Sequence, residues 1–324
     1  MEILALLIEA RCKRMEKTMI VKWKFKESET FIEIEKTNPK ERTEQMKTFK
    51  QTKSSIKVDR RIMMKKLNAV VALTTTLMGA TLLPQTTLKV AAAPPPTGIK
   101  NVVLVHGAFA DGSGWEAVAK ILEKDGYTVS VVQHPETSFA EDVKFTKAEI
   151  DRQPGPVVLV GHSYGGAVIT EAGNDPNVAA LVYIAAFAPD AGESAASLEQ
   201  SVPPAGKSIK ENADGYFYID PACFAADFCA DVPPAKAEFM AKSQVLFSKD
   251  SFTSPVTSPA WKSKPSWYLV ATEDRAINPE NERKMAKRAN AKTIEVNSSH
   301  AAYISRPKET ARLIEEAATS APQK

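Results

Sequence analysis

The 324-residue sequence is poor in the residues that bind metals. Its three cysteines form no C-x-x-C pair, and no cysteine or histidine follows a metal-binding spacing. Only four histidines occur, namely His106, His134, His162 and His300. We therefore expect no metal site, and the short list of histidines narrows the choice of a catalytic base.

Clustered basic residues, which nucleic-acid binding requires, are missing from the part that reads as a folded domain. Residues 1–62 carry 16 Lys/Arg and 10 Asp/Glu, a balance of +6, whereas residues 93–324 carry 23 and 29, a balance of −6. We expect no nucleic-acid partner. The composition, 44% hydrophobic and 25% charged, is ordinary for a globular protein.

The uncharged stretch 67–83 is short and only moderately apolar for a membrane span, which needs about 20 apolar residues. Its flanks instead predict a secretory signal peptide at 63–92. The supporting features are a starting Met63 or Met64, a basic Lys65-Lys66 pair and small residues at 90–92 before a cleavage at Ala93. We therefore expect a secreted or periplasmic protein that has no stable membrane span once the signal peptide is removed.

Sixty-two residues precede this signal, although a signal peptide must be N-terminal. We interpret 1–62 as a poorly structured upstream extension, with translation starting at Met63 or Met64. Two alternatives stay open: a signal anchor with a basic cytosolic tail, or a real extension whose apolar run is a buried helix. N-terminal sequencing of the native protein distinguishes them. The folded domain is expected at 93–324.

Within that domain, apolar runs alternate with helical patterns. Continuous runs of Val, Ile and Leu joined by helices predict an α/β fold with a mostly parallel, doubly wound sheet. The expected strands are 102–105, 128–132, 157–160, 178–184, 267–271 and 293–296. Helices are expected at 115–124, at 138–152, directly after Gly165, from Pro279 onwards and at 307–318.

The segment 190–260 breaks this alternation. It is rich in proline and in aromatic residues, whose number argues for burial, and we expect a mostly helical cap over the site. The cap contains Cys223 and Cys229, which in an exported protein could form a disulfide, the alternative being two free buried thiols.

The most informative motif is Gly161-His162-Ser163-Tyr164-Gly165. It lies between an apolar strand and a small-residue helix, which is the context of a nucleophile elbow. The turn forces the serine backbone into a strained conformation, and crowding requires glycine at both flanks. The N-terminus of the following helix points its N–H groups beside Ser163, where negative charge develops during acyl transfer.

Three further motifs follow strands at the same edge of the sheet: His106-Gly107-Ala108-Phe109, Thr272-Glu273-Asp274-Arg275 and Ser299-His300. With the elbow, their chain order resembles that of the α/β-hydrolase family over about residues 100–320. The subgroup it resembles contains the small esterases related to methyl-salicylate esterases and hydroxynitrile lyases.

The resemblance implies Ser163 as nucleophile, His300 as general base and Asp274 as the acid that orients the base. Glu273 and Asp190 are rival acids. The oxyanion hole would use the backbone N–H groups of Tyr164 and Ala108, with Phe109 as second choice for the latter.

A serine carboxylic-ester hydrolase acting on a small or medium-sized ester through an acyl-enzyme, without a cofactor, is the expected function. Lactonase, thioesterase or hydroxynitrile lyase-like activity uses the same triad, and a non-catalytic ligand-binding member of the fold is a further alternative. Ala301 and Ala302 follow His300 where hydroxynitrile lyases carry a lysine, which counts against lyase activity. The sequence does not indicate an oligomeric state.

Overall fold

The computed structural model describes residues 19–26, 29–36 and 98–321, which fall into two units, 1–89 and 90–324. In the first unit, β1 (Met19–Lys26) pairs antiparallel with β2 (Glu29–Lys36). The expectation that 1–62 is poorly structured is therefore corrected over these two strands. An alternation of apolar residues with lysine along β1 was the missed signal. The expected signal peptide at 63–92 lies outside the described residues.

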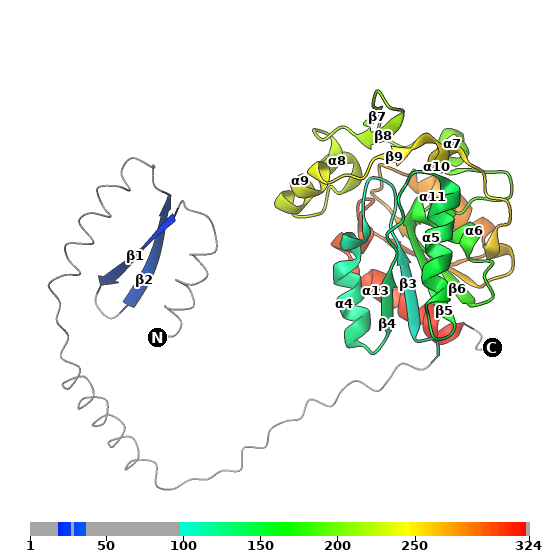
Figure 1. The fold of residues 1–324 in the computed structure, drawn as a ribbon, viewed down its shortest axis with the longest axis horizontal. Coiled ribbons are helices and arrows are strands. Elements are labelled where there is room, and N and C mark those ends of the chain that lie inside the picture. Colours follow the sequence, from blue (N-terminus) through cyan, green and yellow to red (C-terminus); the bar gives the residue numbers. More distant parts are fainter. Residues whose placement is uncertain (1–18, 27–28, 37–97, 322–324) are drawn as a thin grey trace, which may run out of the picture. The chain divides into compact units, whose positions relative to one another are not determined.

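The second unit is built on six parallel strands in the order β11-β10-β6-β5-β3-β4 (Figure 1). The four central strands are buried at every residue except Ala179, which explains why their sequences are continuous apolar runs. The predicted parallel sheet is confirmed. Its strands are β3 (Asn101–Val105), β4 (Thr128–Val131), β5 (Val157–Ser163), β6 (Val178–Ala186), β10 (Ser266–Ala271) and β11 (Lys292–Val296).

Two sets of helices cover this sheet, one on each face (Figure 1). Helix α4 packs against α13, and α5 packs against α6. Ser138 caps α5 by accepting the N–H of Glu141, and Asn278 caps α11, as their sequences predict. The main helices are α4 (Glu116–Lys124), α5 (Phe139–Asp151), α6 (Gly165–Ala172), α11 (Pro279–Arg288) and α13 (Pro307–Ser320).

An insertion between β6 and β10 forms a cap at the top of the domain in Figure 1. Its helices agree with the expected mostly helical cap, and it also contains a small three-stranded antiparallel sheet that the sequence did not predict. The aromatic run 216–218 lies in its central strand. The cap comprises α7 (Ala195–Ser201), β7 (Ile209–Glu211), β8 (Tyr216–Ile219), α8 (Phe224–Phe228), α9 (Pro234–Lys242), β9 (Phe247–Ser248) and α10 (Lys249–Thr253).

Cys223 and Cys229 are free thiols, so the disulfide alternative is not realised. They flank α8 at its two ends. Six residues of helix span about 9 Å, which exceeds the separation of about 7 Å that a disulfide can bridge. Burial raises the pKa of Cys229 to about 12, so its thiol stays protonated.

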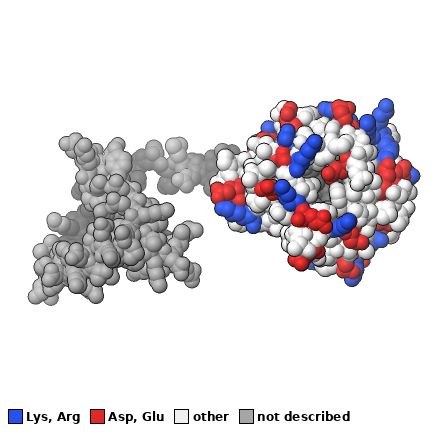
Figure 2. Space-filling view, turned by 90° about the horizontal axis from the view of Figure 1, so that it is seen from above, with Lys and Arg blue, Asp and Glu red and all other residues white. Residues whose placement is uncertain are grey.

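The surface of this domain mixes charges of both signs on the face seen in Figure 2. Ion pairs of this domain include Arg283 with Glu295 and Arg288 with Glu193. Among the helices that the structure describes, none is long and apolar enough to cross a membrane.

Candidate active site

Ser163 occupies the sharp turn between β5 and α6. Its φ of 53° lies in the left-handed region, which is costly for a residue with a Cβ and confirms the predicted backbone strain. A Cβ on Gly161 would lie 2.5 Å from the carbonyl oxygen of Gly165, and one on Gly165 would lie 2.4 Å from that of His106. The two glycines are therefore required by close backbone packing.

The structure brings together Ser163, His300 and Asp274, which come from three different strand ends. The Ser163 hydroxyl lies 2.8 Å from His300 Nε2, and His300 Nδ1 lies 2.6 Å from Asp274 Oδ2. The other carboxylate oxygen, Oδ1, accepts the backbone N–H groups of Ala276 at 2.7 Å and Ile277 at 2.8 Å. Because a carboxylate only accepts hydrogen bonds, Nδ1 donates its proton and Nε2 faces the hydroxyl with a lone pair.

Neither rival acid lies at His300. The Glu273 side chain is exposed and its carboxylate lies 3.5 Å from Asn297 Nδ2. Asp190 instead pairs with Lys262. Asp274 is thus the one of the three candidate carboxylates that contacts the imidazole of His300.

His162, the neighbour of Ser163, is fully buried and hydrogen-bonds through Nε2 to the backbone oxygen of His300 at 3.0 Å. Burial, followed by the charge of His300, lowers the pKa of His162 well below 6.5. A neutral His162 therefore supports the backbone of the base while its ring lies 4.6 Å from that of His300.

Sequence reasoning missed a second buried carboxyl beside the triad, that of Glu282 on α11. Its Oε2 accepts the N–H of Ala271 at 3.0 Å. Burial and then the Asp274 carboxylate raise the pKa of Glu282 well above its usual value, which favours the uncharged acid. A glutamate in the first turn of a helix is ordinary, and the sequence carries no other signal for this contact.

The two candidate oxyanion donors lie beside Ser163. Ala108 and Tyr164 line the same pocket as Ser163, and neither backbone N–H has an acceptor within the described residues. Phe109, the second choice, already donates its N–H to Glu136 Oε2 at 3.3 Å. The geometry thus favours Ala108 over Phe109.

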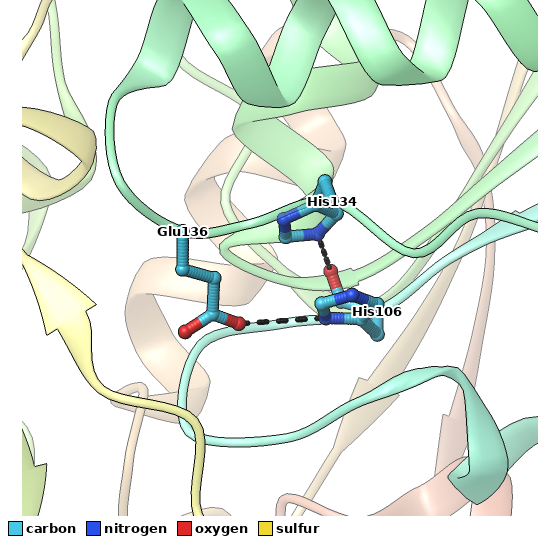
Figure 3. Close-up of side chains that lie close together, drawn as sticks. All are labelled: His106, His134 and Glu136. Atoms are coloured by element: carbon cyan, nitrogen blue, oxygen red, sulfur yellow. Dashed lines mark hydrogen bonds and ion pairs between the residues drawn. The ribbon is translucent and has the colours of Figure 1, made fainter.

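A buried cluster of His106, His134 and Glu136 lies behind this loop (Figure 3), with potential ligand atoms within 4.8 Å of one another. The two imidazole rings stack face to face at 3.7 Å, so their in-plane lone pairs run parallel and do not converge on one ion. His134 Nε2 also donates to the backbone oxygen of His106 at 2.9 Å. Among the described residues, this is the cluster most similar to a metal site, and its geometry fits a hydrogen-bond network better.

The pocket above Ser163 has about 630 Å³ of empty space, open solvent at its mouth included, and residues of the cap line part of it. Its lining is mostly apolar. Six phenylalanines contribute, namely Phe109, Phe187, Phe217, Phe228, Phe247 and Phe252. The charged groups that reach it are Glu199 and the ion pair of Arg275 with Asp227.

The sequence is similar to those of known hydrolases. Residues 102–313 match the model of the alpha/beta hydrolase family. Alpha/beta hydrolase nvfD of Aspergillus novofumigatus is 28% identical over 246 residues, which cover 68% of this chain and 97% of that protein. A pyrethroid hydrolase of Sphingobium wenxiniae is 26% identical over 250 residues, which cover 67% and 86%.

Solved structures share the fold. An extracellular alpha/beta-hydrolase from a Paenibacillus species, described as sharing structural and functional homology with tobacco salicylic acid binding protein 2, superposes with a TM-score of 0.57. It is 22% identical, and the match covers 67% of this chain and 98% of that one.

Proposed function

Since the chain belongs to the alpha/beta hydrolase family, we propose that it is a serine hydrolase that cleaves carboxylic esters of small or medium size. The observation that carries this proposal is the hydrogen-bonded chain from Ser163 through His300 to Asp274. A serine hydroxyl is a weak nucleophile at neutral pH and needs a base within hydrogen-bond reach. The distance of 2.8 Å from Oγ to Nε2 meets that requirement.

In the proposed reaction, Ser163 Oγ attacks the ester carbonyl carbon as His300 Nε2 takes its proton. The negative charge on the tetrahedral intermediate is stabilised by the N–H groups of Ala108 and Tyr164. The protonated imidazole then donates to the leaving alkoxide, and the alcohol departs. A water molecule, deprotonated by His300, hydrolyses the acyl-enzyme and restores the serine.

The pocket lining favours an apolar or aromatic ester. Phenylalanine side chains from the cap and from the oxyanion loop surround the nucleophile, and aromatic edges and faces pack well against a ring.

The test is release of p-nitrophenol from its acetate and butyrate esters by the full chain. We expect turnover by the natural protein and a loss of about 10³-fold or more in kcat for Ser163→Ala. The matched control is Ser263→Ala, whose exposed hydroxyl lies outside the pocket and should leave kcat unchanged. Equal activity of Ser163→Ala and the natural protein would refute the proposal. A parallel panel of lactones, thioesters and cyanohydrins identifies the preferred acyl chemistry.

Export remains a proposal that depends on residues 63–92. The Lys65-Lys66 pair, the uncharged stretch and the small residues before Ala93 support it. Expression with its native N-terminus and sequencing of the secreted or periplasmic protein tests it. A mature chain that begins near Ala93 agrees with export, and one that keeps residues before Met63 contradicts it.

A further inference from the structure

Glu136 is a buried carboxyl that the proposed reaction does not use. It lies in the loop after β4 with 0% of its surface exposed. Its φ of 56° is in the left-handed region, where a glutamate is uncommon. A buried acid on a strained backbone persists only where its surroundings hold it.

On one side, Glu136 holds the oxyanion loop. Its Oε2 accepts the N–H of Phe109 at 3.3 Å, and its Oε1 lies 3.4 Å from His106 Nδ1, the contact drawn in Figure 3. Phe109 itself has a φ of 64°. It directly follows Ala108, so the bond to Glu136 anchors the Ala108–Phe109 peptide group, which adjoins the peptide that carries the Ala108 N–H.

On the other side, Glu136 is linked to the residue after the nucleophile. Its backbone N–H donates to Asp142 Oδ1 at 2.8 Å, and Asp142 Oδ2 accepts the Tyr164 hydroxyl at 2.6 Å. Asp142 is also fully buried. One continuous network therefore runs from Phe109 through Glu136 and Asp142 to Tyr164, and it connects the two candidate oxyanion donors from behind.

The cap contacts the same network through β9 and α10. The N–H of Ser248 donates to the backbone oxygen of Glu136 at 2.9 Å, and the Ser251 hydroxyl donates to Asp142 Oδ2 at 3.0 Å. The ring of Phe247 lies 4.7 Å from that of Tyr164 and 5.7 Å from that of Phe109. These contacts of the cap cover the network of Glu136 and Asp142, keep water from it and hold it in place.

We propose that Glu136 and Asp142 are positioning residues that hold the N–H groups of Ala108 and Tyr164 at the oxyanion. This inference rests on the proposed function, because an oxyanion hole has a role only in acyl transfer. Neither side chain lines the pocket around Ser163, so each acts through the backbone that it holds.

The ionisation of Glu136 determines which substitution should preserve this role. Burial is the main cause that raises its pKa well above the usual value, which favours the uncharged carboxyl. Glutamine keeps an acceptor for the N–H of Phe109 without a charge. Methionine has a similar length and removes the acceptor. Both are unbranched at Cβ, so they meet a similar backbone strain at this position.

The experiment compares Glu136→Gln, Glu136→Met and Tyr164→Phe in the full chain, by kcat, KM and inhibition by an aryl trifluoromethyl ketone. That ketone forms a hemiketal oxyanion with the serine, whereas the matching methyl ketone reports ordinary binding. We expect kcat of Glu136→Gln within about threefold of the natural protein, and a loss of about 10- to 100-fold for Glu136→Met with KM nearly unchanged. Tyr164→Phe keeps its backbone N–H and should lose about 3- to 30-fold in kcat.

The affinity for the trifluoromethyl ketone should fall in parallel with kcat, while that for the methyl ketone stays constant. The matched control is Glu141→Gln, an exposed neighbour that pairs only with Lys144 and should change nothing. Full kcat and full trifluoromethyl ketone affinity in Glu136→Met would overturn the inference, as would an equal loss for both ketones.

Failure of the proposed function is recognised separately, because Ser163→Ala would then keep its activity. If Glu136→Met does not fold, Tyr164→Phe decides, since it removes a single oxygen atom. An unchanged kcat and an unchanged trifluoromethyl ketone affinity in Tyr164→Phe would then contradict the positioning role.

Discussion

At the scale of single residues, the site depends on a chain of buried groups whose protonation states are set by their neighbours. Asp274 has both oxygens occupied, one by two backbone N–H groups and one by His300 Nδ1. This arrangement leaves one orientation for the imidazole. The neutral carboxyl of Glu282 and the neutral ring of His162 add hydrogen bonds without adding charge.

The first prediction concerns Asp274→Asn. An amide at this position can donate to Nδ1 and so favours the tautomer with the proton on Nε2, which cannot accept the serine proton. We expect kcat to fall by about 10³- to 10⁴-fold with little change in KM. Glu273→Gln is the control, since its side chain is exposed and not in contact with His300. An Asp274→Asn enzyme with near-natural kcat would remove Asp274 from the site.

A second prediction concerns Glu199, a pocket residue on α7. Burial raises its pKa to about 7, so it becomes charged as the pH rises through neutrality. We expect KM for an ester that carries a carboxylate to increase above pH 7, while KM for a neutral ester of the same size stays flat. In Glu199→Gln, the KM for the ester that carries a carboxylate should no longer change with pH. If this KM still increases above pH 7 in the variant, a titratable group other than Glu199 causes the increase.

At the scale of elements, the strand–turn–helix unit of β5 and α6 sets the position of the nucleophile. Its tight packing leaves no room for side chains at Gly161 and Gly165. The cap then covers this unit through β9, whose Phe247 contacts Tyr164. Catalytic geometry thus depends on backbone packing within the sheet and on aromatic packing from the insertion.

Gly165→Ala provides the test at this scale. The new Cβ would lie 2.4 Å from the backbone oxygen of His106, which cannot move without moving the oxyanion loop. We expect a loss of at least about 1–3 kcal/mol in the free energy of unfolding and a strong loss of kcat. Gly155→Ala is the control, because the nearest atom to its Cβ is 3.7 Å away. Equal urea midpoints for the two variants would contradict the packing argument.

Sequence periodicity was sufficient for the parallel sheet because its central strands are buried on both faces and therefore read as apolar runs. The nucleophile elbow could also be predicted from the sequence, since close packing restricts its two flanking positions to glycine. The cap sheet could not be predicted, because β7 to β9 have only two to four residues each and share no burial pattern, β7 being exposed and β9 buried. Glu136, Asp142 and Glu282 gave no signal either: a buried carboxyl depends on partners that are distant in the sequence.

At the scale of the whole molecule, buried ionisable groups make stability depend on pH in two opposite ways. His106 and His162 have pKa values lowered below 6.5, mainly by burial, so they contribute stability that is lost as the pH falls below 6.5. Glu136 and Glu282 have pKa values raised above 4.5, so their contribution is lost as the pH rises above 4.5. The two effects oppose each other between these values.

We therefore expect the free energy of unfolding to change little between pH 4.5 and 6.5, and Glu136 and Glu282 to lower it as the pH rises towards their raised pKa values. Each group contributes up to about 1.4 kcal/mol per pH unit within its own window. Urea unfolding across pH measures this, and Glu136→Gln should reduce the alkaline slope while Glu141→Gln should not. Identical slopes in both variants would show that Glu136 does not titrate as described.

The proposed ester hydrolysis depends on Ser163 being an activated nucleophile. Reaction of the folded protein with a fluorophosphonate, followed by peptide mass spectrometry, tests this directly, because the reagent bonds to an activated serine whatever the natural substrate is. We predict one phosphonylated residue, Ser163, with labelling strongly reduced in His300→Ala and abolished in the unfolded chain. An unlabelled Ser163 in the folded protein, or labelling that does not depend on His300, would contradict the account.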